Sequence, residues 1–205
     1  MIMENEITLE NNKVYLQGKV MDEPELNHIV KGEEFYSFNL KVARLSGQCD
    51  KIPIIINKKQ LVHYGIKKDD DIALRGQFRS HNQMDNDKRK LLLSVFVKDV
   101  CEWNDDANAN CIELDGYICK PSIYRTTPFA REICDILLAV NRNYNKSDYI
   151  PCIAWGANAQ IVSRLKVSSN IKIQGRIQSR EYSKNIGDEI VTKTAFEVSI
   201  SKLLD

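Results

Sequence analysis

Residues that could ligate a metal or act as catalytic nucleophiles are scattered along this chain. The cysteines form no C-x-x-C pair and lie near no histidine doublet, so the spacing of a zinc site is absent. No Ser/His/Asp, G-x-S-x-G, P-loop or H-E-x-x-H motif occurs. We therefore expect no catalytic residues, no metal or other cofactor, and a protein that is not an enzyme. The thiols are predicted to be reduced and mostly buried; they are Cys49, Cys101, Cys111, Cys119, Cys134 and Cys152.

Composition and charge exclude several further classes of protein. A hydrophobic fraction of 43% and a charged fraction of 28% are typical of globular proteins. No apolar run approaches the roughly 18 residues of a membrane span, and the N-terminal MIMENEITLE is acidic where a targeting peptide would be basic. We expect a cytoplasmic, nucleoid-associated protein. The net charge of +1 argues against binding of polyanions through the whole surface, but it permits one basic half.

Five sequence blocks recur in the same order after about a hundred residues. In order, the blocks are a Gly-containing strand followed by Pro, a strand that ends in Arg, a strand with Pro at its second position, an Ile-x-x-x-Gly strand, and a closing apolar strand. The block pairs are 16–24 with 114–121, 37–44 with 135–142, 52–56 with 150–154, 72–80 with 171–179, and 91–100 with 194–203. The chain is therefore predicted to be a duplicated domain.

Each copy is predicted to fold as a small closed barrel. Period-2 alternation in segments such as 14–20 and 171–177 indicates short strands. Residues 157–166 carry apolar side chains at helical spacing, which predicts a short helix. The fold class is therefore all-β, with two tandem five-stranded barrels of the OB-fold type and one short helix per repeat. Strand glycines mark the sharp bends that closure requires; they are Gly18, Gly76, Gly116 and Gly175.

The segment 102–110 has no apolar periodicity and is predicted to link the two barrels. We place the boundary so that residues 1–108 form the N-terminal domain and residues 109–205 the C-terminal domain. Residues 1–108 hold 16 basic and 18 acidic side chains, or −2, and the remainder holds 13 and 10, or +3. The positive charge therefore lies in the second half.

The second copy resembles the bacterial single-stranded-DNA-binding protein family, including its PriB-like members. The motifs that carry the likeness are Gly116 to Pro121, Leu138-Ala-Val-Asn-Arg142, Asp148-Tyr-Ile-Pro-Cys-Ile-Ala-Trp-Gly156 and Lys172-Ile-Gln-Gly-Arg-Ile-Gln-Ser-Arg180. They cover nearly all of residues 111–203. The resemblance implies an OB fold that binds single-stranded DNA without catalysis and largely without regard to sequence, in replication, recombination or repair.

A binder of single strands needs exposed aromatic rings for base stacking and basic side chains for the phosphates. Strand alternation over 149–155 places Tyr149, Pro151, Ile153 and Trp155 on one face, with small apolar residues toward the barrel interior. The resemblance adds Tyr144 and Tyr182. The expected stacking residues are therefore Tyr144, Tyr149, Trp155 and Tyr182, and the expected phosphate-binding residues are Arg142, Lys146, Arg176, Arg180 and Lys184.

The first copy keeps the barrel pattern but lacks these aromatic residues. It holds Lys51 and Asn57 where the second copy has Tyr149 and Trp155, and Ser46 and about Asn82 where the second has Tyr144 and Tyr182. The N-terminal domain is therefore expected to serve assembly or a protein contact, while the C-terminal domain binds most of the DNA.

The resemblance also implies an assembly of four OB folds, which two copies of this chain would supply as a homodimer. The Gly/Pro-rich tail with an acidic tip that the family usually carries is not found before Asp205, so recruitment of replication or restart proteins through such a tail is not expected. No small-molecule substrate or membrane is expected as a partner. Two alternatives stay open: a PriB-like primosomal or mobile-element protein-interaction module with secondary DNA or RNA contact, and an OB fold that prefers RNA.

Overall fold

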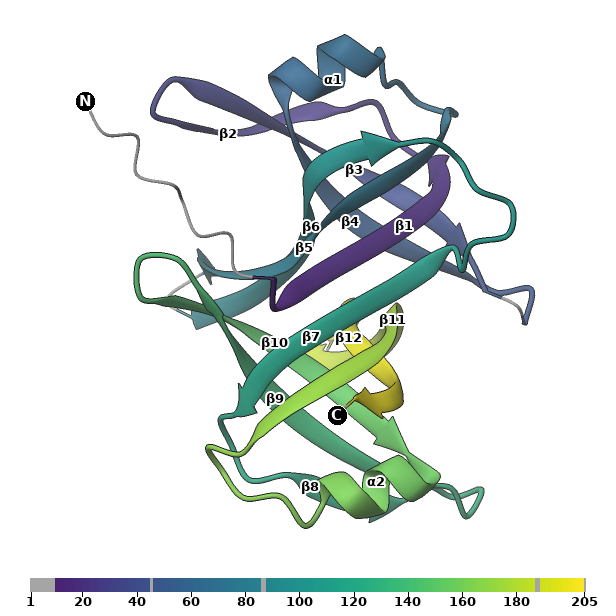
Figure 1. The fold of residues 1–205 in the computed structure, drawn as a ribbon, viewed down its shortest axis with the longest axis vertical. Coiled ribbons are helices and arrows are strands. Elements are labelled where there is room, and N and C mark those ends of the chain that lie inside the picture. The colour runs from purple at the N-terminus through teal and green to yellow at the C-terminus, as the bar shows by residue number, and fades with distance from the viewer. Residues whose placement is uncertain (1–9, 45, 86–87, 187–188, 205) are drawn as a thin grey trace.

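The computed structural model describes residues 10–44, 46–85, 88–186 and 189–204, without the side chains of 83–89 and 184–191. It contains two OB-fold barrels, one after the other in the chain (Figure 1). The first consists of β1 (Asn12–Val20), β2 (Glu25–Val30), β3 (Glu33–Ala43), β4 (Cys49–Asn57), α1 (Lys58–Tyr64), β5 (Asp71–Asp85) and β6 (Lys88–Cys101). The second consists of β7 (Asn110–Ile118), β8 (Ile123–Thr126), β9 (Glu132–Arg142), β10 (Lys146–Trp155), α2 (Gly156–Val162), β11 (Asn170–Ile186) and β12 (Glu189–Leu204). The predicted fold class is confirmed.

Each barrel is closed by a strand that pairs on both sides. In the first, β1 pairs with β5 and turns to meet β3 at Lys19 and Val20; in the second, β7 pairs with β11 and meets β9 at Tyr117 and Ile118. Parallel pairing of β4 with β6 and of β10 with β12 completes the two barrels. The interior is aliphatic, as period-2 alternation requires; its fully buried side chains include Leu16, Leu40, Ile52, Leu114, Leu138 and Ile150.

The two barrels join through antiparallel pairing of their first strands, β1 and β7, which lie side by side across the middle of the molecule (Figure 1). The register pairs Val14 with Ile112, and these two residues occupy the same place in the two copies. On either side of this pair, Asn12 meets Leu114 and Leu16 meets Asn110. The junction therefore has approximate two-fold symmetry, and the two helices lie at opposite ends of the long axis.

Two buried asparagines reproduce this symmetry at the strand ends. The Asn12 side chain bonds the backbone N–H and carbonyl of Phe78, and the Asn110 side chain bonds those of Ile177. Each amide thus satisfies two buried backbone groups where β5 or β11 leaves its barrel as a long hairpin. Sequence reasoning assigned Asn110 to the linker, whereas it is the first residue of β7.

The helix of the second barrel is shorter than the segment 157–166 that the apolar spacing predicts. After Val162 the backbone bonds change to i→i−3, from Arg164 N–H to the Ile161 carbonyl and from Leu165 N–H to the Val162 carbonyl. Such a tightened last turn ends an α-helix. The apolar residue Leu165 still packs against the core from this turn, which explains why its spacing looked helical.

Candidate nucleic-acid interface

Strand β10 carries two of the predicted stacking residues on its outer face. Tyr149 and Trp155 are 44% and 37% exposed, while Ile150, Cys152 and Ala154 point into the barrel and are buried. Ile153, which alternation places on the same face, is only 6% exposed. Ile153 pairs with Ser199 of β12, and the Trp155 indole donates to Ser199 Oγ at 3.2 Å.

Trp155 occupies a position where the local fold favours a different residue. It is the N-cap of α2 and makes no side-chain cap bond. In the first barrel the equivalent residue, Asn57, accepts a bond from the Lys59 backbone N–H at 2.8 Å and caps α1. Replacing a capping side chain by one that cannot cap costs about 1 kcal/mol. The second barrel thus gives up helix capping for an exposed indole held by Ser199.

The N-terminal domain positions Tyr149. Ser80 of β5 accepts a bond from the Tyr149 backbone N–H at 2.8 Å, and its own backbone N–H donates to the Asp148 carboxylate at 2.7 Å. Asp148 has no exposed side-chain surface. The β5–β6 hairpin therefore holds the start of β10, and the backbone position of Tyr149 depends on both domains.

The other two predicted aromatic residues lie apart from β10. Tyr144 is 80% exposed in the β9–β10 turn, where it and Asn145 have φ of 63° and 54°. A bulky residue in the left-handed region is uncommon, and strained backbone of this kind clusters at functional sites. Tyr182 is 38% exposed on β11, where it lines a groove of about 840 Å³ together with residues of the N-terminal domain, among them Pro53 and His81.

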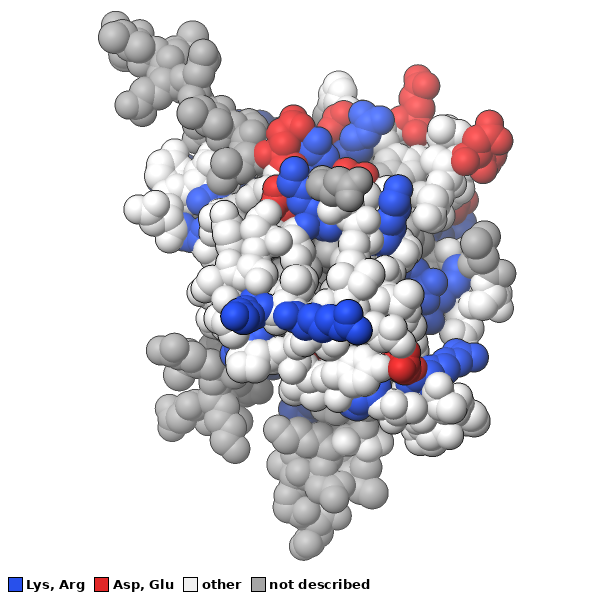
Figure 2. Space-filling model, turned by 60° about the horizontal axis from the view of Figure 1, so that its bottom comes forward, with Lys and Arg blue, Asp and Glu red and all other residues white. Residues whose placement is uncertain are grey.

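The predicted basic residues are distributed over the same domain. Arg176 and Arg180 are exposed on β11, and Arg176 donates weakly to Gln178 at 3.4 Å. Arg142 and Lys146, at the two ends of the β9–β10 turn, line a pocket with Tyr144. The Lys184 side chain lies outside the described residues. Figure 2 tilts the C-terminal domain toward the reader: most carboxylates gather at the upper rim, and basic side chains spread over the middle and lower parts.

Arg142 differs from an exposed phosphate ligand because it lies next to a buried carboxylate. Its Nε is 3.3 Å from Asp148 Oδ2, and among the described residues neither atom has a hydrogen-bond partner. Burial raises the pKa of Asp148, although the Ser80 N–H and the charges of Arg142 and Arg79 act in the opposite direction. The basic character of this corner is thus only partly neutralised.

Two basic residues of the same pocket were missed by the sequence reasoning, namely Arg79 of β5 and Lys98 of β6. Both belong to the N-terminal domain, which was predicted to contribute little to binding because it lacks the aromatic residues. The repeat itself contains the signal: Arg79 aligns with Gln178, so the first copy has a cation where the second has none.

Residues 109–204 match the model of the single-strand binding protein family. Single-stranded DNA-binding protein 3 of Streptococcus agalactiae is 33% identical over 96 residues, which are 43% of this chain and 70% of that protein. The chain belongs to the single-strand binding protein family. Protein 1 of Streptococcus pyogenes is also 33% identical over 96 residues, covering 74% of its length, while the match to protein 2 of Listeria monocytogenes covers 60% of the relative.

A solved structure shares the fold over both barrels. The wild-type single-stranded DNA binding protein from Thermus aquaticus superposes with a TM-score of 0.69 at 20% identity, over 94% of this chain and 91% of that one. The sequence likeness covers the second barrel, whereas this structural likeness extends over both. Among the described residues, neither helix is long and apolar enough to cross a membrane, and no three potential metal ligands gather.

Proposed function

We propose that this protein binds single-stranded DNA, without catalysis and largely without regard to sequence, in DNA replication, recombination or repair. The observation that carries the proposal is the pair of exposed aromatic side chains on β10, Tyr149 and Trp155, in the barrel that matches the family model. Stacking on one aromatic ring contributes roughly 1–3 kcal/mol per base and tolerates any base. A cytoplasmic location with the nucleoid is part of this proposal.

The proposed path of the strand follows the predicted residues from β10 to the β9–β10 turn and the β11–β12 hairpin. Tyr144 and Tyr182 supply further rings, and the exposed Arg176 and Arg180 contact phosphates along the way. Phosphate contacts make binding fall with rising salt. Lys184 stays in the proposal as a hairpin residue whose side chain the structure does not describe.

The division of labour between the domains is also a proposal. We place the boundary between residues 108 and 109, between β6 and β7, and assign DNA stacking to the C-terminal domain. In the N-terminal domain, Lys51 is exposed on the face equivalent to Tyr149, and Asn57 serves as a helix cap, so neither offers a ring to a base. That domain contributes assembly, and two chains form a homodimer of four OB folds.

The test is the binding of labelled oligo-dT, followed by fluorescence anisotropy, to the wild type and to the double variant Tyr149→Ala, Trp155→Ala. Loss of two stacking platforms weakens binding by at least tenfold, since about 2 kcal/mol or more is removed. The control is Lys51→Ala with Asn57→Ala, at the same positions of the first barrel, which leaves affinity almost unchanged. Equal affinity of both double variants would refute this surface and favour the protein-interaction alternative.

A further inference from the structure

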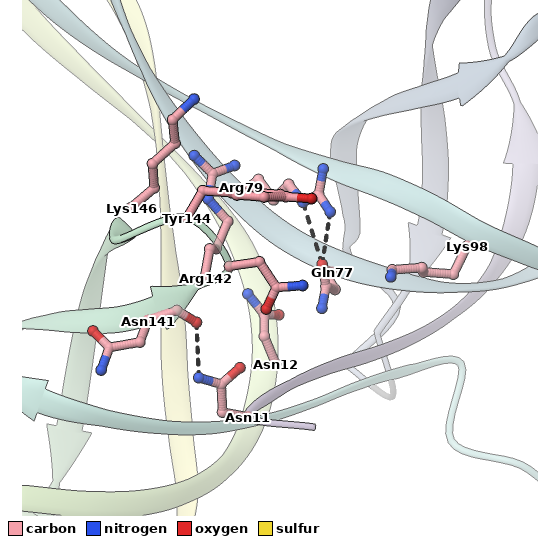
Figure 3. A pocket seen from close by; sticks show the side chains of 10 residues that line it. Asn11, Asn12, Gln77, Arg79, Lys98, Asn141, Arg142, Tyr144 and Lys146 are labelled. Atoms are coloured by element: carbon pink, nitrogen blue, oxygen red, sulfur yellow. Dashed lines mark hydrogen bonds between the residues drawn. The ribbon is translucent and has the colours of Figure 1, made fainter. Parts of the chain in front are cut away.

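A polar pocket of about 310 Å³ lies at the junction of the two domains. Figure 3 shows its lining side chains: Arg142, Tyr144 and Lys146 come from the β9–β10 turn, and Arg79 and Lys98 come from β5 and β6. The remaining lining residues are amides, and no carboxylate is among the ten described residues that line the pocket. Four cations from two domains thus face one small volume.

Arg79 is held in place before any ligand arrives. Gln77 Oε1 accepts bonds from its Nη2 at 2.8 Å and Nε at 3.3 Å, and its guanidinium carbon lies 4.0 Å from the centre of the Phe96 ring. Burial, and then the positive charge of Arg142, lower the pKa of Arg79. A preorganised guanidinium next to another cation favours an anionic ligand.

At the equivalent junction, on the other side of the two-fold axis, the corresponding arginine is neutralised by a carboxylate. There Arg44 donates from both Nε and Nη2 to the buried Asp50, with 2.7 Å between Nε and Oδ2. Arg142 approaches Asp148 only through the unbonded 3.3 Å contact, among the described residues. Arg44 is thus held by two hydrogen bonds to its carboxylate, whereas the ion pair of Arg142 with Asp148 is a single looser contact that leaves guanidinium donors for a ligand.

Three other lining positions differ between the two junctions in the same direction, whereas the position of Gln77 holds Arg176 in the second copy. The positions of Arg79 and Lys98 are occupied in the second copy by Gln178 and Ser201, since Gly76 pairs with Val97 as Gly175 pairs with Ile200. Lys146 corresponds to Gln48. Only one of the two equivalent junctions, within the described residues, therefore combines four basic side chains.

We propose that this pocket binds a phosphodiester group of the single strand where the strand passes from the C-terminal to the N-terminal domain. Arg79 and Arg142 provide fixed guanidinium groups, and Lys98 and Lys146 provide mobile charges at the rim. The N-terminal domain is then part of the DNA interface despite lacking the stacking residues. This inference rests on the proposed function, because the strand must first bind to the C-terminal barrel.

The test exchanges the two basic residues that the N-terminal domain contributes to the pocket for the residues of the equivalent junction, in the variant Arg79→Gln, Lys98→Ser. Binding of oligo-dT is measured by anisotropy over a series of salt concentrations. Loss of one phosphate contact lowers the slope of log K against log salt by about 0.7 and weakens binding about tenfold. The control, Lys67→Ser with Lys68→Gln, removes the same charge from an exposed turn of the N-terminal domain.

A slope and affinity equal to those of the control would overturn the pocket, provided that the wild type binds. Absence of binding by the wild type would instead overturn the proposed function itself. Because Arg79 is partly buried, its substitution can impair folding, so the single variant Lys98→Ser, at an exposed position, is measured as well. Its affinity is expected to fall about threefold, which on a logarithmic scale is about half of the effect of the double variant. An unchanged slope in this variant, if the double variant does not fold, would also refute the inference.

Discussion

At the residue scale, the two barrels differ in the hydrogen bonds and pKa shifts of two equivalent buried aspartates. Asp50 and Asp148 each receive a serine N–H from the other domain, from Ser179 and Ser80 respectively. Burial acts to raise the pKa of both carboxyls. For Asp50 the bonds from Arg44 and Ser179 outweigh burial and leave its pKa lowered, whereas the pKa of Asp148 is raised. The two aspartates occupy equivalent positions, but ionisation is favoured by folding at Asp50 and disfavoured at Asp148.

We predict that Asp50→Asn destabilises the protein more than Asp148→Asn does. Because the pKa of Asp50 is lowered in the folded protein, its ionised carboxylate stabilises the fold at any pH above the pKa that Asp50 has in the unfolded chain. This stability is lost as the pH falls through the pKa of the folded state. Removing it leaves Arg44 unpaired and costs about 3 kcal/mol at pH 7. Ionised Asp148 is disfavoured by folding, so its neutral substitute costs about 1 kcal/mol or less.

Urea unfolding at pH 7 and at about pH 3 measures both effects, the lower value lying below the ordinary pKa of aspartate. The difference between the wild type and Asp50→Asn should shrink at the lower pH, because Asp50 of the unfolded chain then takes up a proton while the folded carboxylate, whose pKa is lowered, loses its charge only at still lower pH. Equal free energies of unfolding for the two variants at pH 7 would contradict the asymmetry.

At the scale of elements, strand crossings rather than turns hold the barrels closed. A Cβ at Gly175 would lie 2.2 Å from the Ser199 backbone oxygen, at the bulge where β11 crosses β12. At Gly116 the nearest backbone oxygen, of Ala139, would be 2.9 Å away. Glycine is required where a backbone of the next strand fills the space, because backbone cannot give way as a flexible side chain can.

We expect Gly175→Ala to lower the free energy of unfolding by about 3 kcal/mol and Gly116→Ala by about 1 kcal/mol. Thermal and urea unfolding of the two variants provide the comparison. Since neither glycine belongs to the proposed interface, oligo-dT affinity of the folded fraction should stay close to that of the wild type. A smaller loss at Gly175 than at Gly116 would show that the crossing can relax.

At the scale of the whole molecule, the sheet order leaves β2 and β8 as its two ends. Both carry exposed apolar side chains, among them Ile29 at 59% and Ile123 at 62%. Edge strands with apolar side chains are sites where chains associate. These edges lie in equivalent places of the two barrels, which suits the proposed assembly of two chains around a common centre.

The proposed homodimer predicts a mass in solution of twice the 23.5 kDa of the chain. Light scattering after size-exclusion chromatography measures this mass, with and without oligo-dT. Ile29→Glu with Ile123→Glu is expected to shift the mass toward the single chain, because a buried charge opposes association. A wild-type protein that runs as a monomer at high concentration would contradict the dimer.

The duplication, the two barrels and the alternation that turns Tyr149 and Trp155 outward could be predicted from the amino-acid sequence, because strand periodicity and repeated blocks are local properties of the chain. Helix and strand ends were less accurate, as at Val162 and Asn110, where backbone bonds decide the boundary. Only the tertiary structure brought Arg79 and Lys98 to Arg142 and Lys146. Those contacts depend on the pairing of β1 with β7, and no local pattern specifies how two barrels join.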